Sequence, residues 1–598
     1  MCGILGSNTE ISESDFHKVL KTLDRRGPDI QSAKKTDTFY FGHTRLAIVD
    51  LDERSNQPFF YAHEGKEITL TFNGEIYNFL SVKSELEALN FQFTTSSDTE
   101  VVAAAYLAWG KASFDKFEGM WALAVYEEDT KKIIFSRDRV GKKPLYIFDK
   151  ENGEISFSSA LKSIKEIHHS IKFQLNQEAI SLYFALGFVP GKHSIYKDIY
   201  KVRAGEIIEY SYEAGKGYFY ENNNFSSYSG KSDPKRTVKS HIEEAVKNRM
   251  ISDVPYCTLL SSGVDSSIVT YYSKKHNPTI EAFTVGFNDP KLNELEGARK
   301  IAKRIGVKLN ELYLDDADIE EAFLEYYNAY EEPFADYSGI PTLALFKKIG
   351  KHYRLAFTGD GGDELFFGYP HYWKKYVLYK LNRIQRILPF IKNMAPAKIR
   401  NIISCKKEAF ESEYLKLNFC VTESSENYIN MVFSEVLKTD KNFMRATIEY
   451  DRKLNNLPDK YLVKVDRASM AYSVEVRSPL MDERLKKKTQ KTSLWKIFTP
   501  FSLKLYLKLK YIKLFGLNYL FAKKKGFTPP VVQLINNAFS ENEYAQFLKI
   551  IKTHHQEVFA YFENISFNKL KNRKLQYQRV YFFYEWLKSQ KYDEATNN

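Results

Sequence analysis

A short run of small, polar residues near the middle of the chain has the composition of a phosphate-binding loop. The apolar run Tyr256 to Leu260 predicts a buried strand, and Val264 to Lys274 predicts the helix that follows the loop. Free backbone N–H groups and the helix dipole favour an anion at such a helix start. No Gly-Lys-Ser/Thr closes the loop, which excludes a Walker-type loop. The carboxylate of Asp265 beside a phosphate favours a bridging Mg²⁺, and an ordinary strand–helix turn is the competing interpretation.

A second reactive group stands at the start of the chain. Removal of the initiator Met would leave Cys2 as the mature N-terminus. The pKa of an α-amine is about 7.7–8.0, so near neutral pH the amine can take up the thiol proton and activate the sulfur as a nucleophile. The alternative is that Cys2 merely follows the start codon.

The elements around Cys2 predict a layered α+β domain over roughly the first 200 residues. Thr69 to Phe72 predicts a strand that ends in Asn73-Gly74-Glu75, and Ser97 is the expected N-cap of a helix. Met120 to Tyr126 and Lys131 to Ser136 alternate in polarity and predict a hairpin.

Around the phosphate-type loop the pattern changes to alternating strands and helices, which predicts a parallel α/β sheet. Further strands are expected at Ile280 to Phe287, Leu309 to Leu314 and Tyr353 to Phe357, with a helix at Leu295 to Ile305. Ligands of such sheets bind at the carboxyl ends of the strands. We therefore expect the loop Ser261 to Ser267 and the acidic, Gly-rich stretch Asp360 to Asp363 to share one edge.

Composition narrows the class of protein. The chain has 598 residues and a formal net charge of +12 without a zinc-finger or RNA-binding signature, so nucleic acid is not an expected partner. Its four cysteines lie far apart, which argues against a disulfide framework and fits a reducing compartment. No signal pattern and no apolar run of about 18 residues occurs, so we expect a cytoplasmic protein without a membrane span.

The first half resembles the class II glutamine amidotransferase domain. The resemblance rests on Cys2-Gly3-Ile4, Arg26-Gly27-Pro28-Asp29, Asn73-Gly74-Glu75-Ile76-Tyr77-Asn78, Ser97-Asp98-Thr99-Glu100 and Arg137-Asp138-Arg139-Val140-Gly141. It implies an N-terminal-nucleophile fold with four stacked αββα layers. It also implies Cys2 as the nucleophile, Asn73 and Gly74 as oxyanion donors, and a glutamine site formed by Arg45, Glu75 and Asp98. Arg25 stands where many relatives have His.

The second half resembles the asparagine synthase domain, an ATP-pyrophosphatase fold related to the adenine nucleotide alpha hydrolases. The matching blocks are Ser261 to Ser267, Phe283 to Phe287, Glu332-Pro333, Asp336 to Pro341, Thr358 to Phe366, Lys464 to Ala471 and Glu475 to Pro479. The resemblance assigns ATP and pyrophosphate binding to Leu260, Ser261, Ser262, Gly263, Asp265, Ser266, Ser267, Val285, Thr358 and Gly359. It assigns Mg²⁺ binding to Asp265 and Asp363, and catalysis to Asp360 and Arg467.

Three residues depart from the commoner family pattern. Ser262 replaces a Gly, and a positive φ there would cost about 1 kcal/mol or more. Asp360 stands where Glu is frequent, which shortens the reach to a substrate amine by a methylene group. Arg467 replaces the Lys of some members, keeping the charge but losing any role as an acid.

These resemblances imply an α+β N-terminal-nucleophile domain followed by an α/β parallel-sheet ATP-pyrophosphatase domain with a helical C-terminal part. The expected ranges are 2–205 for the glutaminase domain, 206–236 for a linker, 237–535 for the synthase domain and 536–598 for a helical extension. The Lys-rich stretch 503–525 has no predicted role; its first part is either a packed element or a surface element that contacts a membrane.

The implied function is that of a glutamine-dependent asparagine synthetase. Glutamine would supply ammonia, ATP would activate aspartate as an acyl-adenylate with release of pyrophosphate, and ammonia would displace AMP through a dry passage between the domains. The three departures leave open another carboxylate acceptor, such as a uronic acid in a surface polysaccharide. A non-catalytic regulator would require loss of catalytic residues that are present here, and a homodimer is left open.

Overall fold

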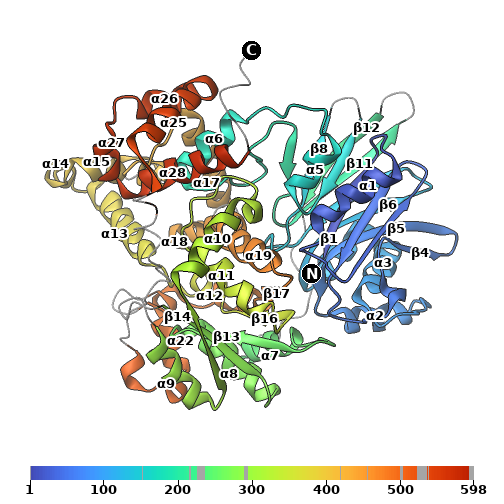
Figure 1. The fold of residues 1–598 in the computed structure, drawn as a ribbon. Helices are drawn as coiled ribbons and strands as arrows, with labels where there is room; N and C mark the ends of the chain where they lie inside the picture. The colour runs from blue at the N-terminus through green and yellow to red at the C-terminus, as the bar shows by residue number, and fades with distance from the viewer. Residues whose placement is uncertain are drawn as a thin grey trace.

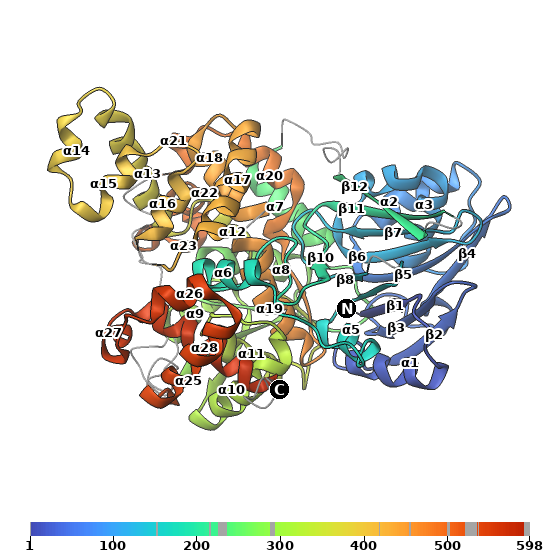
Figure 2. The same ribbon diagram turned by 90° about the horizontal axis from the view of Figure 1, so that it is seen from above.

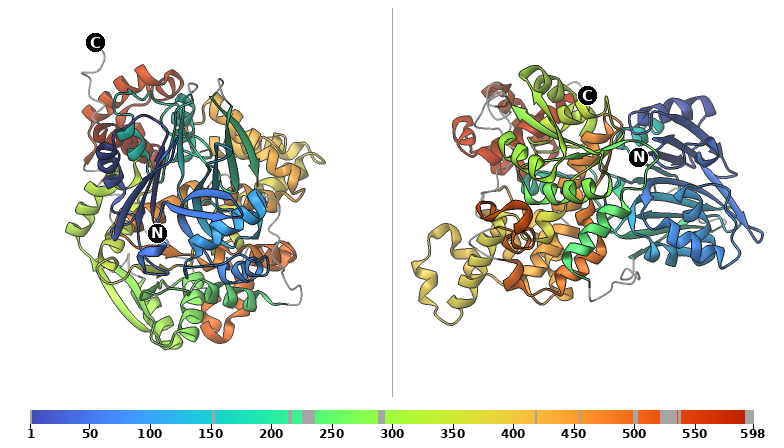
Figure 3. Two further views of the ribbon diagram at one scale, coloured as in Figure 1. Left: turned by 90° about the vertical axis from the view of Figure 1, so that its right-hand side faces the viewer. Right: turned by 90° about the horizontal axis from the view of Figure 1, so that it is seen from below.

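The computed structural model describes residues 2–150, 153–213, 217–224, 236–287, 294–417, 419–453, 456–498, 503–520, 535 and 538–590. A sheet-rich half and a half dominated by helices lie side by side in Figures 1 and 2. Strand β1 begins at the boundary between them (Figure 3). None of the described helices combines the length and apolarity needed to cross a membrane.

Two six-stranded sheets form the first half. One has the order β10 (Ile199–Lys201), β8 (Tyr146–Asp149), β9 (Ile155–Ser158), β1 (Gly3–Ser7), β3 (Tyr40–Arg45) and β2 (Ile30–Lys35). The other has the order β12 (Gly217–Asn224), β11 (Glu206–Glu213), β7 (Lys132–Arg137), β6 (Gly119–Glu127), β5 (Lys66–Ile76) and β4 (Phe59–His63). Helices α1 (Glu13–Leu20) and α5 (Leu161–Ile167) cover the first sheet, and α2 (Phe79–Glu87) and α3 (Asp98–Trp109) cover the second.

Alternation along single strands explains these four layers. In β6, Ala122 and Tyr126 face the core between the two sheets, whereas Trp121 and Leu123 face α2 and α3. In β1, Ile4 likewise faces the second sheet and Leu5 faces α1. Because both faces of each strand are buried, both sets are apolar. The predicted αββα fold is confirmed.

The second half contains a five-stranded parallel sheet, as predicted. Its order is β15 (Lys308–Leu314), β14 (Glu281–Phe287), β13 (Tyr256–Leu259), β16 (Leu355–Phe357) and β17 (Glu475–Arg477). Helices α7 (Val238–Asn248), α8 (Val264–His276) and α9 (Leu295–Ile305) pack on one face. The other face is covered by α10 (Asp316–Tyr330), α11 (Gly339–Ile349) and α19 (Leu462–Met470).

Helices make up most of the remaining described chain. Besides the short helix α4 (Ser113–Lys116) of the first half and the helix α6 (Gln177–Leu186), they are α12 (Gly362–Leu365), α13 (Pro370–Gln385), α14 (Phe390–Met394), α15 (Ala397–Ser404), α16 (Phe410–Lys416), α17 (Glu423–Thr439), α18 (Phe443–Lys453), α20 (Glu483–Gln490), α21 (Leu494–Ile497), α22 (Leu505–Lys510), α23 (Ile512–Phe515), α25 (Glu541–His554), α26 (Gln556–Phe562), α27 (Phe567–Lys571) and α28 (Lys574–Ser589). The helical C-terminal part is therefore confirmed.

Two segments lie elsewhere than the sequence suggested. The expected linker 206–236 begins with β11 and β12, which pair with each other and extend the second antiparallel sheet, so this part belongs to the first domain. Helix α6, inside the expected first domain, packs against α17 and α28 of the second half (Figures 1 and 2). The end of the Lys-rich stretch, residues 521–525, lies outside the described residues.

Candidate active site

A pocket at the start of β1 gathers most of the predicted glutamine-site residues. Its lining includes Cys2, Arg45, Gly74, Glu75 and Asp98. The chain supplies them from four separate elements: the start of β1, the end of β3, the end of β5 and the first turn of α3. The antiparallel pairing of β1 with β3 brings Gly3 opposite Thr44, which places Cys2 beside Arg45.

The cysteine is buried next to the expected oxyanion donors. The backbone N–H of Cys2 donates to Asn73 Oδ1 at 3.1 Å. Burial raises the pKa of the Cys2 thiol, so the sulfur needs a local base to become a thiolate. A Cβ on Gly74 would lie 2.2 Å from the carbonyl oxygen of Met120, so this position has room only for glycine.

Opposite charges line the same pocket. The Arg45 guanidinium donates to the Asp52 carbonyl and to Asn56 Oδ1, both at 2.8 Å, and these bonds fix its orientation. Asp98 Oδ2 accepts the Ile76 N–H at 2.8 Å, while burial raises the pKa of this carboxyl to about 6. A guanidinium and carboxylates facing one pocket can bind the two charged ends of an amino acid.

The second domain completes this pocket through β17, a role that sequence reasoning did not assign. Glu475 lines the pocket, and the fully buried Arg477 donates to Glu475 at 2.6 Å and to Glu75 at 2.9 Å. Although burial opposes ionisation, Arg477 lowers the pKa of Glu475 to about 2. The matched block Glu475 to Pro479 was the only sequence signal for these two residues, and it carried no role.

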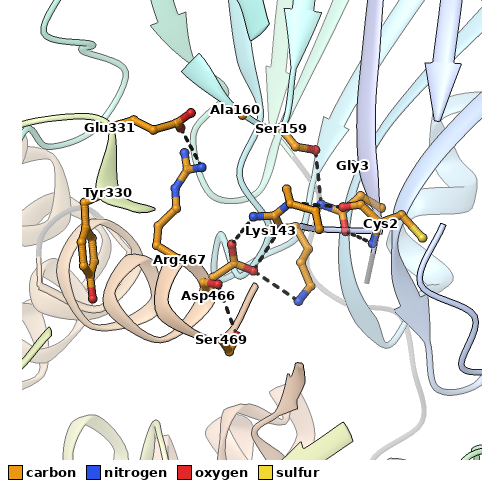
Figure 4. A network of polar contacts seen from close by, with 12 residues as sticks. Cys2, Gly3, Lys143, Ser159, Ala160, Tyr330, Glu331, Asp466, Arg467 and Ser469 are labelled. Carbon is orange, nitrogen blue, oxygen red and sulfur yellow. Dashed lines mark hydrogen bonds and ion pairs between the residues drawn. The ribbon is translucent and has the colours of Figure 1, made fainter. Parts of the chain in front are cut away.

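A further buried ion network joins the domains near Cys2 (Figure 4). Arg26 donates through Nε to the carbonyl oxygen of Cys2 at 3.2 Å and through NH1 to Asp466 Oδ2 at 3.0 Å. Lys143 Nζ lies 3.7 Å from the other carboxylate oxygen of Asp466. Burial opposes ionisation of Asp466, but Arg26 and Lys143 lower its pKa to about 2. Arg26 of the Arg-Gly-Pro-Asp motif thus links Cys2 to the second domain.

The departure at Arg25 also has a place at this boundary. Its guanidinium pairs with Glu325 of α10, and its carbonyl oxygen accepts the Ser473 hydroxyl at 2.8 Å. Arg25 therefore contacts the second domain and leaves the Cys2 pocket intact.

The serine loop, residues 261–267, lies between β13 and α8 at the carboxyl edge of the parallel sheet. Ser261 Oγ and Ser266 Oγ are 2.9 Å apart, and the Ser267 hydroxyl donates to the Gly263 carbonyl at 2.6 Å. The N–H of Leu260 donates to the Phe283 carbonyl at 2.8 Å, two residues before Val285 on β14. These hydrogen bonds hold the loop in its conformation.

The stretch after β16 meets the serine loop at this edge, as predicted. A Cβ on Gly359 would lie 2.5 Å from the backbone nitrogen of Ser266. The Thr358 hydroxyl donates to Asp360 Oδ2 at 2.6 Å. The shared edge follows from the parallel register of β13 and β16.

Ser262 fits its position without backbone strain. It is not among the residues with positive φ. Its hydroxyl donates to Glu294 Oε2 at 2.8 Å, and its Cβ occupies space that Gly297 of α9 leaves open: a Cβ on Gly297 would lie 2.6 Å from Ser262 Cβ. The expected cost of a positive φ therefore does not arise.

Asp265 and Asp363 meet across the two loops. A Cβ on Gly362 would lie 2.3 Å from Asp265 Oδ1, and one on Gly368 would lie 1.8 Å from Asp363 Oδ1. Two carboxylates in a cradle shaped by glycines, next to a candidate phosphate loop, fit Mg²⁺, which binds one or two carboxylates together with substrate phosphates. The ammonium of Lys504 lies between the two carboxylates and acts as the cation there.

The contacts of Arg467 differ from those of Asp360. On α19 it turns away from Asp466 and pairs with Glu331 Oε2 at 2.8 Å (Figure 4). It also donates to the Tyr146 hydroxyl at 3.1 Å, across the domain boundary. A small interface cavity lies here, and its lining includes the ionisable side chains of Lys142 and Asp466 as well as Arg467.

Comparisons with known proteins agree with this architecture. The family described as "Glutamine amidotransferase domain" matches residues 1–220, and the family described as "Asparagine synthase" matches residues 237–488. The chain is 33% identical over 512 residues to the putative asparagine synthetase [glutamine-hydrolyzing] 2 of Methanocaldococcus jannaschii, covering 79% of this chain and 98% of that protein. It is 28% identical over 513 residues to asparagine synthetase [glutamine-hydrolyzing] 1 of Bacillus subtilis, covering 81% and 80%. Against asparagine synthetase B [glutamine-hydrolyzing] of Escherichia coli it is 27% identical over 396 residues, covering 62% of this chain and 66% of that protein. The chain therefore belongs to the glutamine-hydrolysing asparagine synthetase family.

Proposed function

We propose that this chain, a ligase of a family that uses glutamine and ATP, amidates the side-chain carboxylate of aspartate to give asparagine. The single observation that carries the proposal is the joining of two sites by β17. Glu475, at one end of this strand, lines the Cys2 pocket, and Ser478, directly after it, lies 3.1 Å from the Thr358 hydroxyl at the serine-loop edge. A nitrogen-releasing site and an ATP site thus share one buried element.

In the first half-reaction the Cys2 sulfur attacks the side-chain amide carbon of glutamine. Charge develops on the amide oxygen, where the Asn73 side chain and the Gly74 N–H would stabilise it. The carbon–nitrogen bond then breaks, ammonia leaves, and water releases glutamate from the thioester. Because burial raises the pKa of the Cys2 thiol, its proton must go to a base, and the α-amine of a mature Cys2 is the base within reach. Arg45 and Asp98 would hold the two charged ends of glutamine.

In the second half-reaction an oxygen of the acceptor carboxylate attacks the α-phosphorus of ATP. The bond to the β-phosphate oxygen breaks, which gives an acyl-adenylate and pyrophosphate; the serine loop would bind the pyrophosphate at the start of α8. Ammonia then attacks the acyl carbon and AMP leaves. Asp265 and Asp363 would hold Mg²⁺, which supplies charge neutralisation of the phosphates when bound.

The roles of Asp360 and Arg467 follow from their different surroundings. Asp360, next to Thr358, would face the acceptor amine. Arg467, paired with Glu331 and held against Tyr146, would act electrostatically at the interface cavity through which ammonia passes. The names of the relatives support aspartate as the acceptor.

The acceptor is tested by measuring pyrophosphate, AMP and the amide product with glutamine, ATP and either aspartate or a panel of other carboxylates that includes uronic acids. The proposal requires equal amounts of pyrophosphate, AMP and asparagine with aspartate. Pyrophosphate release with another carboxylate, and none with aspartate, would reject aspartate and keep the amidation chemistry.

The division between the two sites is tested with Cys2→Ala. This variant should lose all glutamine-driven synthesis and keep synthesis with added ammonia. If ammonia-driven synthesis also disappears while the thermal unfolding temperature stays unchanged, the assignment of the two sites is wrong.

A further inference from the structure

Lys504 lies where the predicted metal would lie. Its ammonium is 2.5 Å from Asp363 Oδ1 and also contacts Asp265 Oδ2. The residue is 6% exposed and directly precedes α22, with a left-handed backbone at φ 58°. A non-glycine residue in this conformation is uncommon and is retained only where the surroundings determine it.

The segment that carries Lys504 is anchored on the nucleotide site. The Tyr519 hydroxyl donates to the carbonyl oxygen of Ser262 in the serine loop. The Tyr511 hydroxyl donates to the Tyr272 hydroxyl of α8 at 3.2 Å. Within the segment, the Lys508 ammonium donates to the Leu520 carbonyl at 3.1 Å. Residues 504–520 therefore form a packed element over the serine loop. Of the two alternatives that the sequence left open for the first part of the Lys-rich stretch, these contacts favour the packed element.

An ammonium and a Mg²⁺ cannot occupy the same place between two carboxylates. Mg²⁺ takes oxygen ligands at about 2.0–2.1 Å in an octahedron, which leaves no room for a third group between the oxygens. A lysine ammonium sits on a flexible four-carbon stem and can turn to another anion. The neighbouring site for an anion is the serine loop. Tyr519 already contacts this loop through Ser262, and Lys504 contacts it through Asp265.

We propose that Lys504 is a pyrophosphate-binding residue that neutralises Asp265 and Asp363 in the nucleotide-free enzyme and turns to the β- and γ-phosphates when Mg²⁺ and ATP bind. The inference rests on the proposed assignment of the serine loop to pyrophosphate. In both states, cations then lie beside the two carboxylates. Before binding, the Lys504 ammonium is that cation; after binding, the metal lies between the carboxylates and the ammonium lies against the phosphates. None of these groups has to change its protonation state.

The test uses the full chain with Lys504→Met, and Lys510→Met as the matched control, because Lys510 ends the helix that Lys504 directly precedes and has an exposed side chain. Mn²⁺ binding without nucleotide is measured by electron paramagnetic resonance, and binding of pyrophosphate with Mg²⁺ by calorimetry. Lys504→Met should bind Mn²⁺ at least tenfold more tightly, because no ammonium competes for the carboxylates, and pyrophosphate at least tenfold more weakly. Lys510→Met should match the wild type within about twofold.

Unchanged Mn²⁺ affinity or unchanged pyrophosphate affinity in Lys504→Met overturns the proposal. Glutamine hydrolysis, carried by the Cys2 pocket, reports on folding; if Lys504→Met loses it, Lys504→Gln takes its place in both binding measurements. The readouts use metal and pyrophosphate alone, so they do not depend on the acceptor. Failure of aspartate as the acceptor would leave this result untouched, and wild-type enzyme that binds no pyrophosphate would reject the serine-loop assignment itself.

Discussion

The pairing of Ser262 with Gly297 makes a prediction whose size follows from the geometry. In Gly297→Ala the new methyl carbon would lie 2.6 Å from Ser262 Cβ, whereas two carbon atoms normally pack at about 3.5–4.0 Å. The serine loop must therefore move by about 1 Å or the helix must shift. Overpacking of this kind costs about 1–3 kcal/mol, and alanine in place of glycine in α9 returns about 1 kcal/mol through helix propensity.

Gly297→Ala should therefore affect stability and activity differently. Thermal unfolding of Gly297→Ala should change little, because the two contributions offset each other to within about 2 kcal/mol. Pyrophosphate release should suffer the full displacement of the loop, and 1–3 kcal/mol corresponds to a decrease of roughly 5- to 150-fold in kcat/KM for ATP. Glutamine hydrolysis at the Cys2 pocket should stay at the wild-type rate.

A second substitution provides the control. Ser262→Gly removes the Cβ that the new methyl group would meet, so Gly297→Ala in that background should regain the pyrophosphate release of Ser262→Gly alone. The double-mutant coupling should then be at least about 1 kcal/mol. Gly297→Ala with unimpaired pyrophosphate release in the presence of Ser262, or a double variant as impaired as Gly297→Ala, would refute the reasoning.

Two further predictions concern the glutamine pocket. Because burial raises the pKa of Asp98 to about 6, this carboxylate gains a proton as the pH falls below 6 and no longer attracts the glutamine amine. Between pH 7 and pH 5, protonation of Asp98 should lower the kcat/KM of glutamine hydrolysis about tenfold beyond the decrease caused by protonation of the Cys2 α-amine. Asp98→Asn should lose this additional decrease; a wild-type profile in Asp98→Asn would contradict the assignment. In Arg477→Met the carboxylates of Glu75 and Glu475 lose their buried cation, which should cost about 3–5 kcal/mol; thermal unfolding measures this, and an unchanged unfolding temperature would show that the ion pairs do not hold the domains.

The fold was predictable where the periodicity of the sequence reflects local burial. The apolar run before Ser261 became β13, and the predicted helix Leu295 to Ile305 is α9 with the same bounds. Strand β17 carries the opposite signal: Glu475 and Arg477 are charged yet fully buried. Charged residues predict an exposed strand unless their ion-pair partner is known. The partner of Arg477, Glu75, lies 402 residues away in the sequence. Pairing at that separation leaves no trace in one sequence.

Tertiary pairing also overrode the composition at 206–224. The Asn-rich end of this segment suggested a linker because Asn and Gly are depleted in strands. Eight consecutive pairs between β11 and β12, from Glu206 with Asn224 to Glu213 with Gly217, nonetheless extend the second antiparallel sheet. Lys504 was missed for a related reason: its position between Asp265 and Asp363 depends on a contact across 239 residues, and the surrounding lysines gave it no distinct signal.

Strand β17 explains why the two chemistries belong to one folded unit. Its Arg477 donates to Glu75 of the Cys2 pocket, while the carbonyl oxygen of the same residue accepts the N–H of Thr358 in the second half at 3.0 Å. Ser478 then receives a hydrogen bond from Lys142 of the first domain at 3.1 Å. From Glu475 to Ser478 the chain advances by about 10 Å at roughly 3.3 Å per residue. We therefore expect a displacement at one site to be transmitted to the other through three peptide units held in a buried sheet, and we expect a swap of either domain to require that both faces of this strand are preserved.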